Sequence, residues 1–252
     1  MSKNNLQIDW NSRFSAQASW TKPLREYLTR QLGFTKNSKI LEMGCGTGTI
    51  LRELSDSVGC CPLGIDFDFE RLRIGQHFAS EQILLCADGN SAPFRDDSFD
   101  FIIFHYFLLW VKNPEFLLKS ARRLLVPGGT IVAFAEPDYK SRIEYPEEFE
   151  KIGSFQTKSL IHQGINPIIG RQLPGLLSGA GYKDIQFGIS GFQKPAKSIS
   201  KDHSSEWEVL CNDLKIIGQS SLVPKFQIKD QEAIDKGERV SWVPTFYAFG
   251  KK

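Results

Sequence analysis

The residues of this sequence whose types and spacing could do chemistry begin with a glycine loop. The loop Gly44–Gly48 (GCGTG) follows a short apolar run and precedes apolar residues at helical spacing, as between a strand and a helix. Such a loop lets a ligand approach the backbone closely, and the usual ligand is a phosphate. Here Thr49 stands where the dinucleotide pattern G-x-G-x-x-G needs its third glycine, so a dinucleotide is disfavoured.

An acid lies two residues before the loop. Glu42 is near the end of the apolar run 39–43, where a carboxylate would repel a pyrophosphate and favour a positively charged ligand. S-adenosylmethionine (SAM) is such a ligand, because it has an ammonium group and a sulfonium but no phosphate. The loop alone also fits a structural turn without a ligand, but the loop and the acid together favour SAM.

Two further acids end the next two apolar runs. Asp66 is placed to accept hydrogen bonds from both ribose hydroxyls of an adenosine, and Asp88 could accept one from the adenine amino group. Each acid by itself fits equally well as a helix N-cap. Because ligands of open α/β sheets bind at the carboxyl ends of the strands, three acids at successive strand ends favour a ligand site.

The elements that would position these residues alternate along the chain. Apolar runs and segments of helical periodicity follow one another between residues 39 and 136, which predicts a doubly wound α/β sheet with parallel strands and right-handed crossovers. Before them, Thr21 and Pro23 predict the start of a helix and Gly33 its end. The predicted strands are residues 39–43, 63–65, 83–86, 101–107, 130–135, 184–192 and 245–250.

Composition limits the possible partners and location. Lys and Arg number 31 and Asp and Glu 29, so no strong field of one sign favours nucleic acid. The N-terminus lacks the apolar core of a signal peptide, and the longest apolar stretch, residues 99–111, is too short to span a bilayer. We therefore expect a cytoplasmic protein without a membrane partner. The five cysteines show no metal-ligand spacing, so we expect free thiols and no metal site.

In order and spacing, the motifs resemble those of the class I SAM-dependent methyltransferases. The resemblance extends from about Lys39 to Glu136 and is weaker to the C-terminus. A later segment resembles the small-molecule branch, which includes quinone-biosynthesis methyltransferases. The resemblance to the class I family implies a Rossmann-like sheet of seven strands in the order 3-2-1-4-5-7-6, with only the last strand antiparallel. The matching segments are ILEMGCGTG, GIDFD, ADGNSAPF, DDSFDFII, ARRLLVPGG, GRQLPGLLSGAGYKDI and, as the seventh strand, TFYAFGKK.

The resemblance also implies roles for single residues. The predicted strand four ends in FHYF and lacks the Asn/Asp-Pro-Pro-Tyr signature of amino methylation on DNA bases. The implied cofactor residues are Gly44, Cys45 and Gly46 along the methionine part of SAM with Glu42 nearby, Asp66 on the ribose, Phe67 on the adenine ring, Asp88 and Gly89 at the adenine edge, and His105 near the sulfonium.

We expect one methyltransferase domain over residues 1–252. It comprises an N-terminal helical segment (1–37), a SAM-binding core (38–137) and a C-terminal part (138–252) with helical insertions and the last two strands. The segment through Gly33 and the long excursion between Lys194 and Val243 lie outside the motifs, so we expect them to form a lid over the strand ends. Aromatic residues that could wall an acceptor pocket are Trp10, Phe14, Trp20, Tyr106, Trp110 and Trp207.

The expected activity is in-line transfer of the SAM methyl group to a small-molecule acceptor. Such a reaction depends mainly on alignment and exclusion of water, and a base is optional. His105 is either that base or a residue that only packs or hydrogen-bonds beside the cofactor. Alternatives are a SAM-binding scaffold without catalysis, aminopropyl transfer on the same fold and, more distantly, a nicotinamide dehydrogenase. The oligomeric state stays open.

Overall fold

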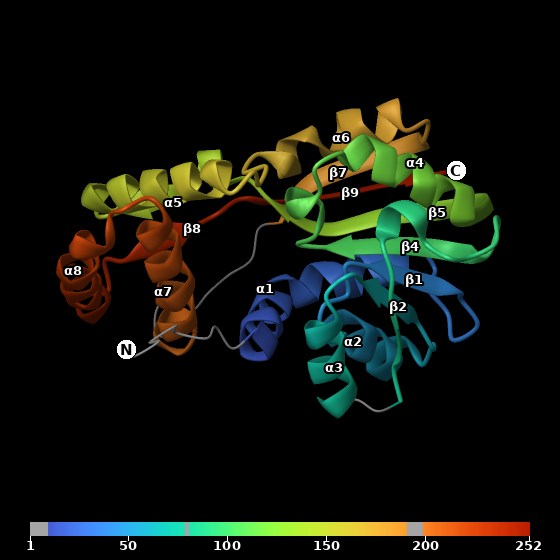
Figure 1. The fold of residues 1–252 in the computed structure, drawn as a ribbon, viewed down its shortest axis with the longest axis horizontal. Coiled ribbons are helices and arrows are strands. Elements are labelled where there is room, and N and C mark those ends of the chain that lie inside the picture. The colour runs from blue at the N-terminus through green and yellow to red at the C-terminus, as the bar shows by residue number, and fades with distance from the viewer. Residues whose placement is uncertain (1–9, 79–80, 191–198) are drawn as a thin grey trace.

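The strands form a seven-stranded sheet in the order β3-β2-β1-β4-β5-β9-β7, seen in a computed structural model that describes residues 10–78, 81–190 and 199–252 (Figure 1). Only β9 is antiparallel to its neighbours. Numbered along the chain within this sheet, the order is 3-2-1-4-5-7-6, which confirms the prediction. The strands are β1 Ile40–Met43, β2 Leu63–Asp66, β3 Ile83–Cys86, β4 Phe99–His105, β5 Leu125–Pro137, β7 Lys183–Ser190 and β9 Thr245–Lys251.

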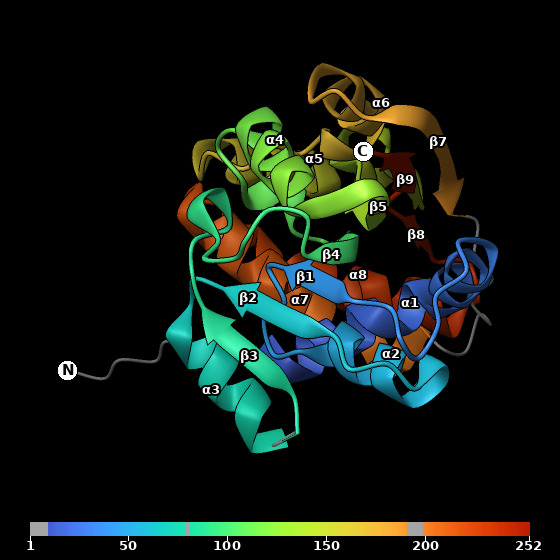
Figure 2. The same ribbon diagram turned by 90° about the vertical axis from the view of Figure 1, so that its right-hand side faces the viewer.

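Helices cover both faces of the sheet. In Figure 2, α4 and α6 lie above it and α1, α2 and α3 below it. Asn113 caps α4 as predicted, because its side chain accepts a hydrogen bond from the Phe116 N–H. The helices are α1 Trp10–Gln31, α2 Thr49–Val58, α3 Phe69–Phe78, α4 Pro114–Leu124 and α6 Ile169–Gly179.

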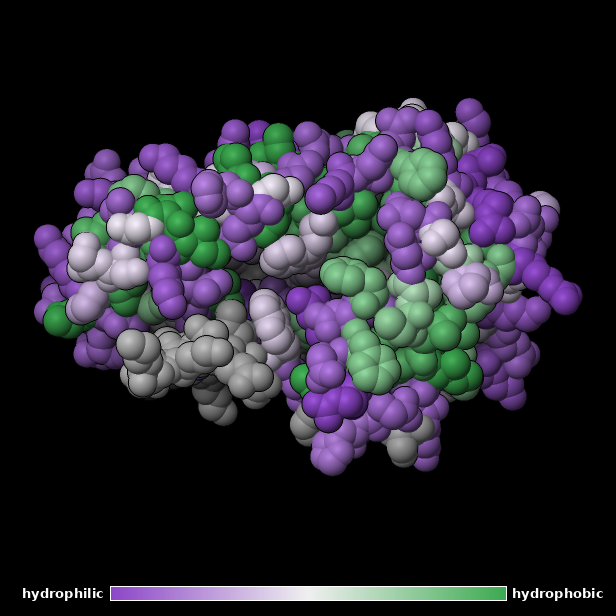
Figure 3. All heavy atoms as spheres, viewed as in Figure 1, coloured by the Kyte–Doolittle hydropathy of each residue, from purple (hydrophilic) through white to green (hydrophobic). Residues whose placement is uncertain are grey.

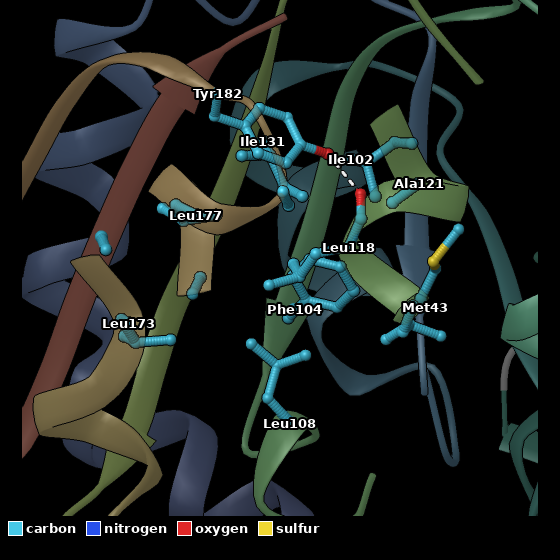
Figure 4. Close-up of a cluster of buried hydrophobic side chains, with 14 of the residues drawn as sticks. Met43, Ile102, Phe104, Leu108, Leu118, Ala121, Ile131, Leu173, Leu177 and Tyr182 are labelled. Carbon is cyan, nitrogen blue, oxygen red and sulfur yellow. Dashed lines mark hydrogen bonds between the residues drawn. The ribbon is translucent and has the colours of Figure 1, made fainter. Parts of the chain in front are cut away.

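The alternation of side chains along each strand decides which residues face which layer. Met43 and Phe104 point into the core under α4 and α6, where Tyr182 Oη donates a hydrogen bond to the Leu118 carbonyl at 2.9 Å (Figure 4). Ile40 and Ile103 belong to the core under α1 and α2. Glu42 lies two residues after Ile40, and His105 lies two residues after Ile103. Both side chains therefore point to the same face of the sheet, toward α1.

A second part of the chain lies beyond the sheet at one end (Figure 1). It contains α5 Glu150–His162, α7 Ile199–Ile216, α8 Val223–Asp235 and a two-stranded sheet of β6 Ile143–Tyr145 and β8 Val240–Trp242. These helices have their own core, which includes Phe149, Trp207 and Leu214. Between this part and the larger sheet, the molecular surface is hollowed (Figure 3).

Short 3-10 turns complete the described elements. They follow strands or precede helices, where they orient the connections at the strand ends. They span Gly89–Ser91, Leu108–Trp110, Tyr139–Ser141, Glu147–Phe149 and Ser220–Leu222.

The start of the first helix was predicted wrongly. The helix begins at Trp10, and Pro23 lies inside it. Thr21 does not cap the helix, because it also lies inside it, and its hydroxyl accepts a hydrogen bond from the Arg25 side chain. In the part of the chain that the structure describes, no helix is both long and apolar enough to cross a bilayer.

Candidate active site

The glycine loop is tied to the neighbouring strand. The N–H groups of Gly44 and Cys45 both donate to the Ile65 carbonyl, at 2.8 and 3.0 Å. Gly44 has φ 76, and a Cβ there would lie 2.0 Å from the Phe107 ring. Both the backbone angle and the close aromatic ring therefore require glycine at this position.

A cavity opens beside this loop at the carboxyl ends of β1, β2 and β4, and we call it the glycine-loop cavity. Trp10 and Phe14 of α1 also line it. The residues predicted from the sequence that line this cavity are Glu42, Gly44, Cys45, Gly46, Asp66, Phe67 and His105.

An adjoining cavity extends toward β3. Asp88 and Gly89 line it, and Gly44, Asp66 and Phe67 line both cavities. The structure thus brings all the predicted cofactor residues to one continuous site. Phe67 is 75% exposed at its rim, where an adenine ring could pack on it.

Glu42 is a buried carboxylate with an unused oxygen. The residue is 2% exposed, and its Oε2 is buried without a hydrogen-bond partner. Burial raises the pKa of Glu42 well above its usual value; the nearby Arg25 charge opposes this effect, and the Asp66 and Glu53 charges add to it. A ligand ammonium group in the glycine-loop cavity would supply the missing partner, so this residue fits the positive end of SAM.

Arg25 was not singled out from the sequence, yet it contacts His105 and two further side chains beside this site. It is 0% exposed and forms a bidentate ion pair with Glu53, at 2.9 Å from Nε and 2.5 Å from Nη2. Its Nη1 lies 2.5 Å from Thr21 Oγ1 and 3.2 Å from His105 Nε2. The only indication in the sequence that Arg25 is buried was weak: it lies on the same helix face as Leu28.

The Arg25 contact fixes the proton position on His105. Arginine can only donate, so Nε2 of His105 accepts and the ring proton lies on Nδ1. Burial, with the Arg25 charge second, lowers the pKa of His105 well below its usual value. His105 is therefore a neutral imidazole in the glycine-loop cavity, with its acceptor nitrogen already occupied by Arg25 and Thr21.

The two strand-end aspartates also stabilise their own loops. Asp66 accepts from the Gly46 N–H through Oδ2 and from the Asp68 N–H through Oδ1, both at 2.9 Å. Asp88 Oδ1 accepts from the backbone and side chain of Asn90. The capping role is confirmed for Asp88, which caps the 3-10 turn Gly89–Ser91, but not for Asp66, because Asp68 accepts from the first N–H groups of α3. These hydrogen bonds hold both carboxylates at the edge of the site.

A second cavity lies between α1, α5 and α7, and we call it the aromatic cavity. Its aromatic lining includes Trp20, Tyr139, Trp207 and Trp242. Tyr106 and Gln17 line both this cavity and the glycine-loop cavity, so the two meet at these side chains.

Tyr106 adopts an unusual backbone conformation. Its φ is 51, in the left-handed region that a bulky residue rarely occupies. Its N–H donates to the Ala135 carbonyl, and its hydroxyl lies 3.3 Å from Thr245 Oγ1. Burial raises the pKa of Tyr106 to about 12. Backbone strain of this kind clusters at functional sites, and no residue pattern around Tyr106 predicted it.

Glu136 holds the loop that follows β4. Its carboxylate accepts from the backbone N–H groups of Phe107 at 3.0 Å, Leu108 at 2.9 Å and Leu109 at 3.4 Å. Burial raises the pKa of Glu136 to about 7, although these hydrogen bonds lower it. This carboxylate thereby positions Phe107 against the glycine loop.

In the described residues, no three His, Cys, Asp or Glu side chains gather as metal ligands would.

Comparison with known proteins agrees with this geometry. A family model described as a methyltransferase domain matches residues 41–133, which contain the glycine loop and the strand-end acids. A demethylmenaquinone methyltransferase of Corynebacterium urealyticum is 32% identical over 126 residues, which cover 49% of this chain and 52% of that protein. The chain spans about half the length of the curated relatives that it matches.

Solved structures share the fold over most of the chain. The [4+2]-cyclase SpnF has a TM-score of 0.61 and 14% identity, covering 92% of this chain and 80% of its own. A phosphoethanolamine N-methyltransferase of Haemonchus contortus, in complex with S-adenosylhomocysteine, has a TM-score of 0.57 and 14% identity, covering 94% and 56%. At this identity the similarity is one of fold, and the chemistry has to be argued from the site.

Proposed function

We propose that this chain, which carries a class I SAM-dependent methyltransferase domain, binds SAM in the glycine-loop cavity and methylates a small molecule held in the aromatic cavity. The observation that carries the proposal is the meeting of the two cavities at Gln17 and Tyr106. Methyl transfer needs donor and acceptor in line, and two adjoining cavities with a shared wall can provide that arrangement.

The residues at the strand ends match the charges of SAM. Glu42 would bind the ammonium group through its free oxygen, and the glycine loop would lie along the methionine part. Asp66 would hold the ribose, while Asp88, Gly89 and Phe67 would contact the adenine. When bound, SAM supplies a methyl carbon that is activated by the sulfonium.

The protein's contribution to the reaction is alignment and exclusion of water. Trp10 and Phe14 from α1 cover the glycine-loop cavity, and Tyr106 and Gln17 form the boundary across which the acceptor must approach. For His105 we propose a positioning role through its Nδ1 proton. Its lowered pKa and its occupied Nε2 make it a poor proton acceptor.

Calorimetric titration with SAM and S-adenosylhomocysteine tests the first half of this proposal. We expect binding in the micromolar range, and absence of binding would refute the function. Decarboxylated SAM in the same titration distinguishes aminopropyl transfer, because that reaction requires it as donor.

A turnover assay on a panel of small aromatic and aliphatic acceptors tests the second half. We expect release of S-adenosylhomocysteine together with an acceptor heavier by one methylene in the mass spectrum. Binding of SAM without turnover on any acceptor would instead favour a non-catalytic scaffold.

A further inference from the structure

Arg13 is a buried cation in the wall of the aromatic cavity. The residue is 9% exposed, and its Nη1 is buried without a hydrogen-bond partner. Its guanidinium carbon lies 5.0 Å from the centroid of the Trp20 ring, and the residues that the structure describes offer it no ion pair. A buried charge without a counter-ion is costly, so this position calls for an anion that comes from outside the chain.

The other two arginines that line this cavity are compensated. Arg142 pairs with Glu144 and donates to Gln156. Arg239 pairs with both Glu144 and Asp230, each at 2.5 Å. Their charges are therefore neutralised within the protein. Arg13 differs from them because no carboxylate of the described chain lies in ion-pair contact with it.

The acids near Arg13 have other hydrogen-bond partners. Burial raises the pKa of Asp213 and the Arg13 charge opposes this effect, but the Asp213 carboxylate accepts from Gln156 and Gln163 and is not in ion-pair contact with Arg13. Asp230 accepts hydrogen bonds from Trp207 Nε1 and Arg239 Nε. Glu206 also lines the cavity and has an interaction partner of its own. An anion bound at Arg13 would have to lie apart from these two carboxylates, next to Arg13 and the α1 residues Gln17 and Trp20 that also line the cavity.

Two tyrosine hydroxyls lie near Arg13. The Arg13 charge acts on the hydroxyls of both Tyr106 and Tyr139, where it lowers pKa values that burial raises. A guanidinium and a phenol together present several N–H and O–H donors, which suit the two oxygens of a carboxylate. The rings of Trp20 and Trp207 provide flat apolar walls beside these donors.

We propose that the aromatic cavity selects a methyl acceptor that carries a carboxylate next to a flat apolar body, and that Arg13 recognises the carboxylate. This inference rests on the proposed function, because it identifies the class of acceptor for that site. The carboxylate of SAM is a less suitable partner, since Arg13 lines the aromatic cavity and not the glycine-loop cavity.

The test compares 2-naphthoate with its neutral isostere 2-naphthamide, each titrated calorimetrically into the full chain saturated with S-adenosylhomocysteine. The wild type should bind naphthoate at least about tenfold more tightly than naphthamide. In Arg13→Gln, naphthoate affinity should fall roughly tenfold to a hundredfold, while naphthamide affinity should stay within about twofold. Arg13→Lys should retain part of the preference, because it keeps the charge and loses the planar fork.

Arg30→Gln is the matched control, because Arg30 belongs to the same helix and is exposed. It should behave as the wild type. The inference is overturned if the wild type binds the two ligands equally or fails to bind naphthoate at millimolar concentration, or if Arg13→Gln keeps the preference. Weaker binding of S-adenosylhomocysteine in Arg13→Gln would also overturn it, by assigning Arg13 to the cofactor. Failure of the wild type to bind S-adenosylhomocysteine would instead refute the proposed function.

Discussion

The imidazole of His105 receives a hydrogen bond from the buried Arg25 guanidinium at the nitrogen that a general base would need. Accepting a proton there would place a second positive charge beside Arg25 in a largely desolvated site. This cost is why the pKa of His105 is lowered, and it favours the neutral form at neutral pH. Of the two roles that the sequence left open for His105, the contacts therefore favour positioning.

Replacing His105 with alanine should separate these roles. We expect S-adenosylhomocysteine affinity to fall roughly tenfold, because a buried hydrogen-bonding side chain is lost from the cavity wall. The pH profile of the single-turnover rate at saturating SAM should keep its shape across neutral pH. A rate lowered by about a hundredfold or more, with unchanged affinity, would identify His105 as the base after all.

Replacing Asp66 with alanine should weaken SAM binding. Losing charged hydrogen bonds to the ribose hydroxyls costs about 1.5 to 3 kcal/mol, or roughly tenfold to a hundredfold in affinity. Calorimetry measures this loss, and circular dichroism checks that the variant is folded. Asp66→Asn serves as a control, since it keeps one oxygen that can accept from the Gly46 N–H. Unchanged affinity in a folded Asp66→Ala variant would remove Asp66 from the site.

At the scale of the elements, the connection after β4 depends on the end of β5. The Glu136 carboxylate accepts from successive N–H groups of the turn that begins at Phe107. This turn carries Phe107 onto Gly44 and Trp110 to the cavity rim. The two strands are therefore joined at their carboxyl ends by a buried carboxyl group, in addition to their ladder of backbone hydrogen bonds.

Glu136 should make stability depend on pH. Its folded-state pKa of about 7 lies above the ordinary 4.5, so the folded state holds this proton to higher pH than the unfolded state does. The protonated Glu136 thereby adds to the free energy of unfolding below the ordinary pKa, and this contribution is lost as the pH rises to about 7. The loss is on the order of 3 kcal/mol. Glu136→Gln should remove it, as measured by urea unfolding across this range.

The comparison between wild type and variant isolates this effect. Glu42 also has a raised pKa and His105 a lowered one, and both remain in the variant. Glu147→Gln, the same change at an exposed position, should follow the wild type. If Glu136→Gln loses as much stability as the wild type between these pH values, the raised pKa of Glu136 is not its source.

The core elements were predictable because their signals are local. The loop Gly44–Gly48 between two periodic segments sufficed to place β1 and α2, and Asn113-Pro114 marked the start of α4. The start of α1 was missed because Pro23 is tolerated inside a helix whose buried face packs on the sheet. The pairing of β6 with β8 was also missed, because it joins short segments far apart in the sequence.

At the scale of the whole molecule, the site is formed by segments that no local pattern connects. The strand-end acids could be found because a parallel sheet gathers its carboxyl ends along one edge. The burial of Arg13 and Arg25 could not be predicted, because an arginine on an amphipathic helix usually reaches solvent. Only the packing of α1 across the sheet and beside α7 shows that both are buried.

Helix α1 spans both cavities, and its two halves have different surroundings. Its first half carries Trp10, Phe14 and Gln17 to the cavities, and its second half packs Leu28 into the core under the sheet. If α1 and the excursion from Lys194 to Val243 form a lid, ligand binding should stabilise the first half selectively. The beginning of this excursion, residues 194–198, lies outside the described residues.

Hydrogen exchange with and without S-adenosylhomocysteine should therefore show a split response. We expect slower exchange in residues 10–20 and in α7, which lines the aromatic cavity through Trp207 and Leu210. The second half of α1 and all of α6 should be unchanged, because they already pack in the core. Protection confined to the loops after β1, β2 and β3 would show that the ligand binds without a lid. Equal protection along the whole of α1 would indicate that the helix responds as one rigid element.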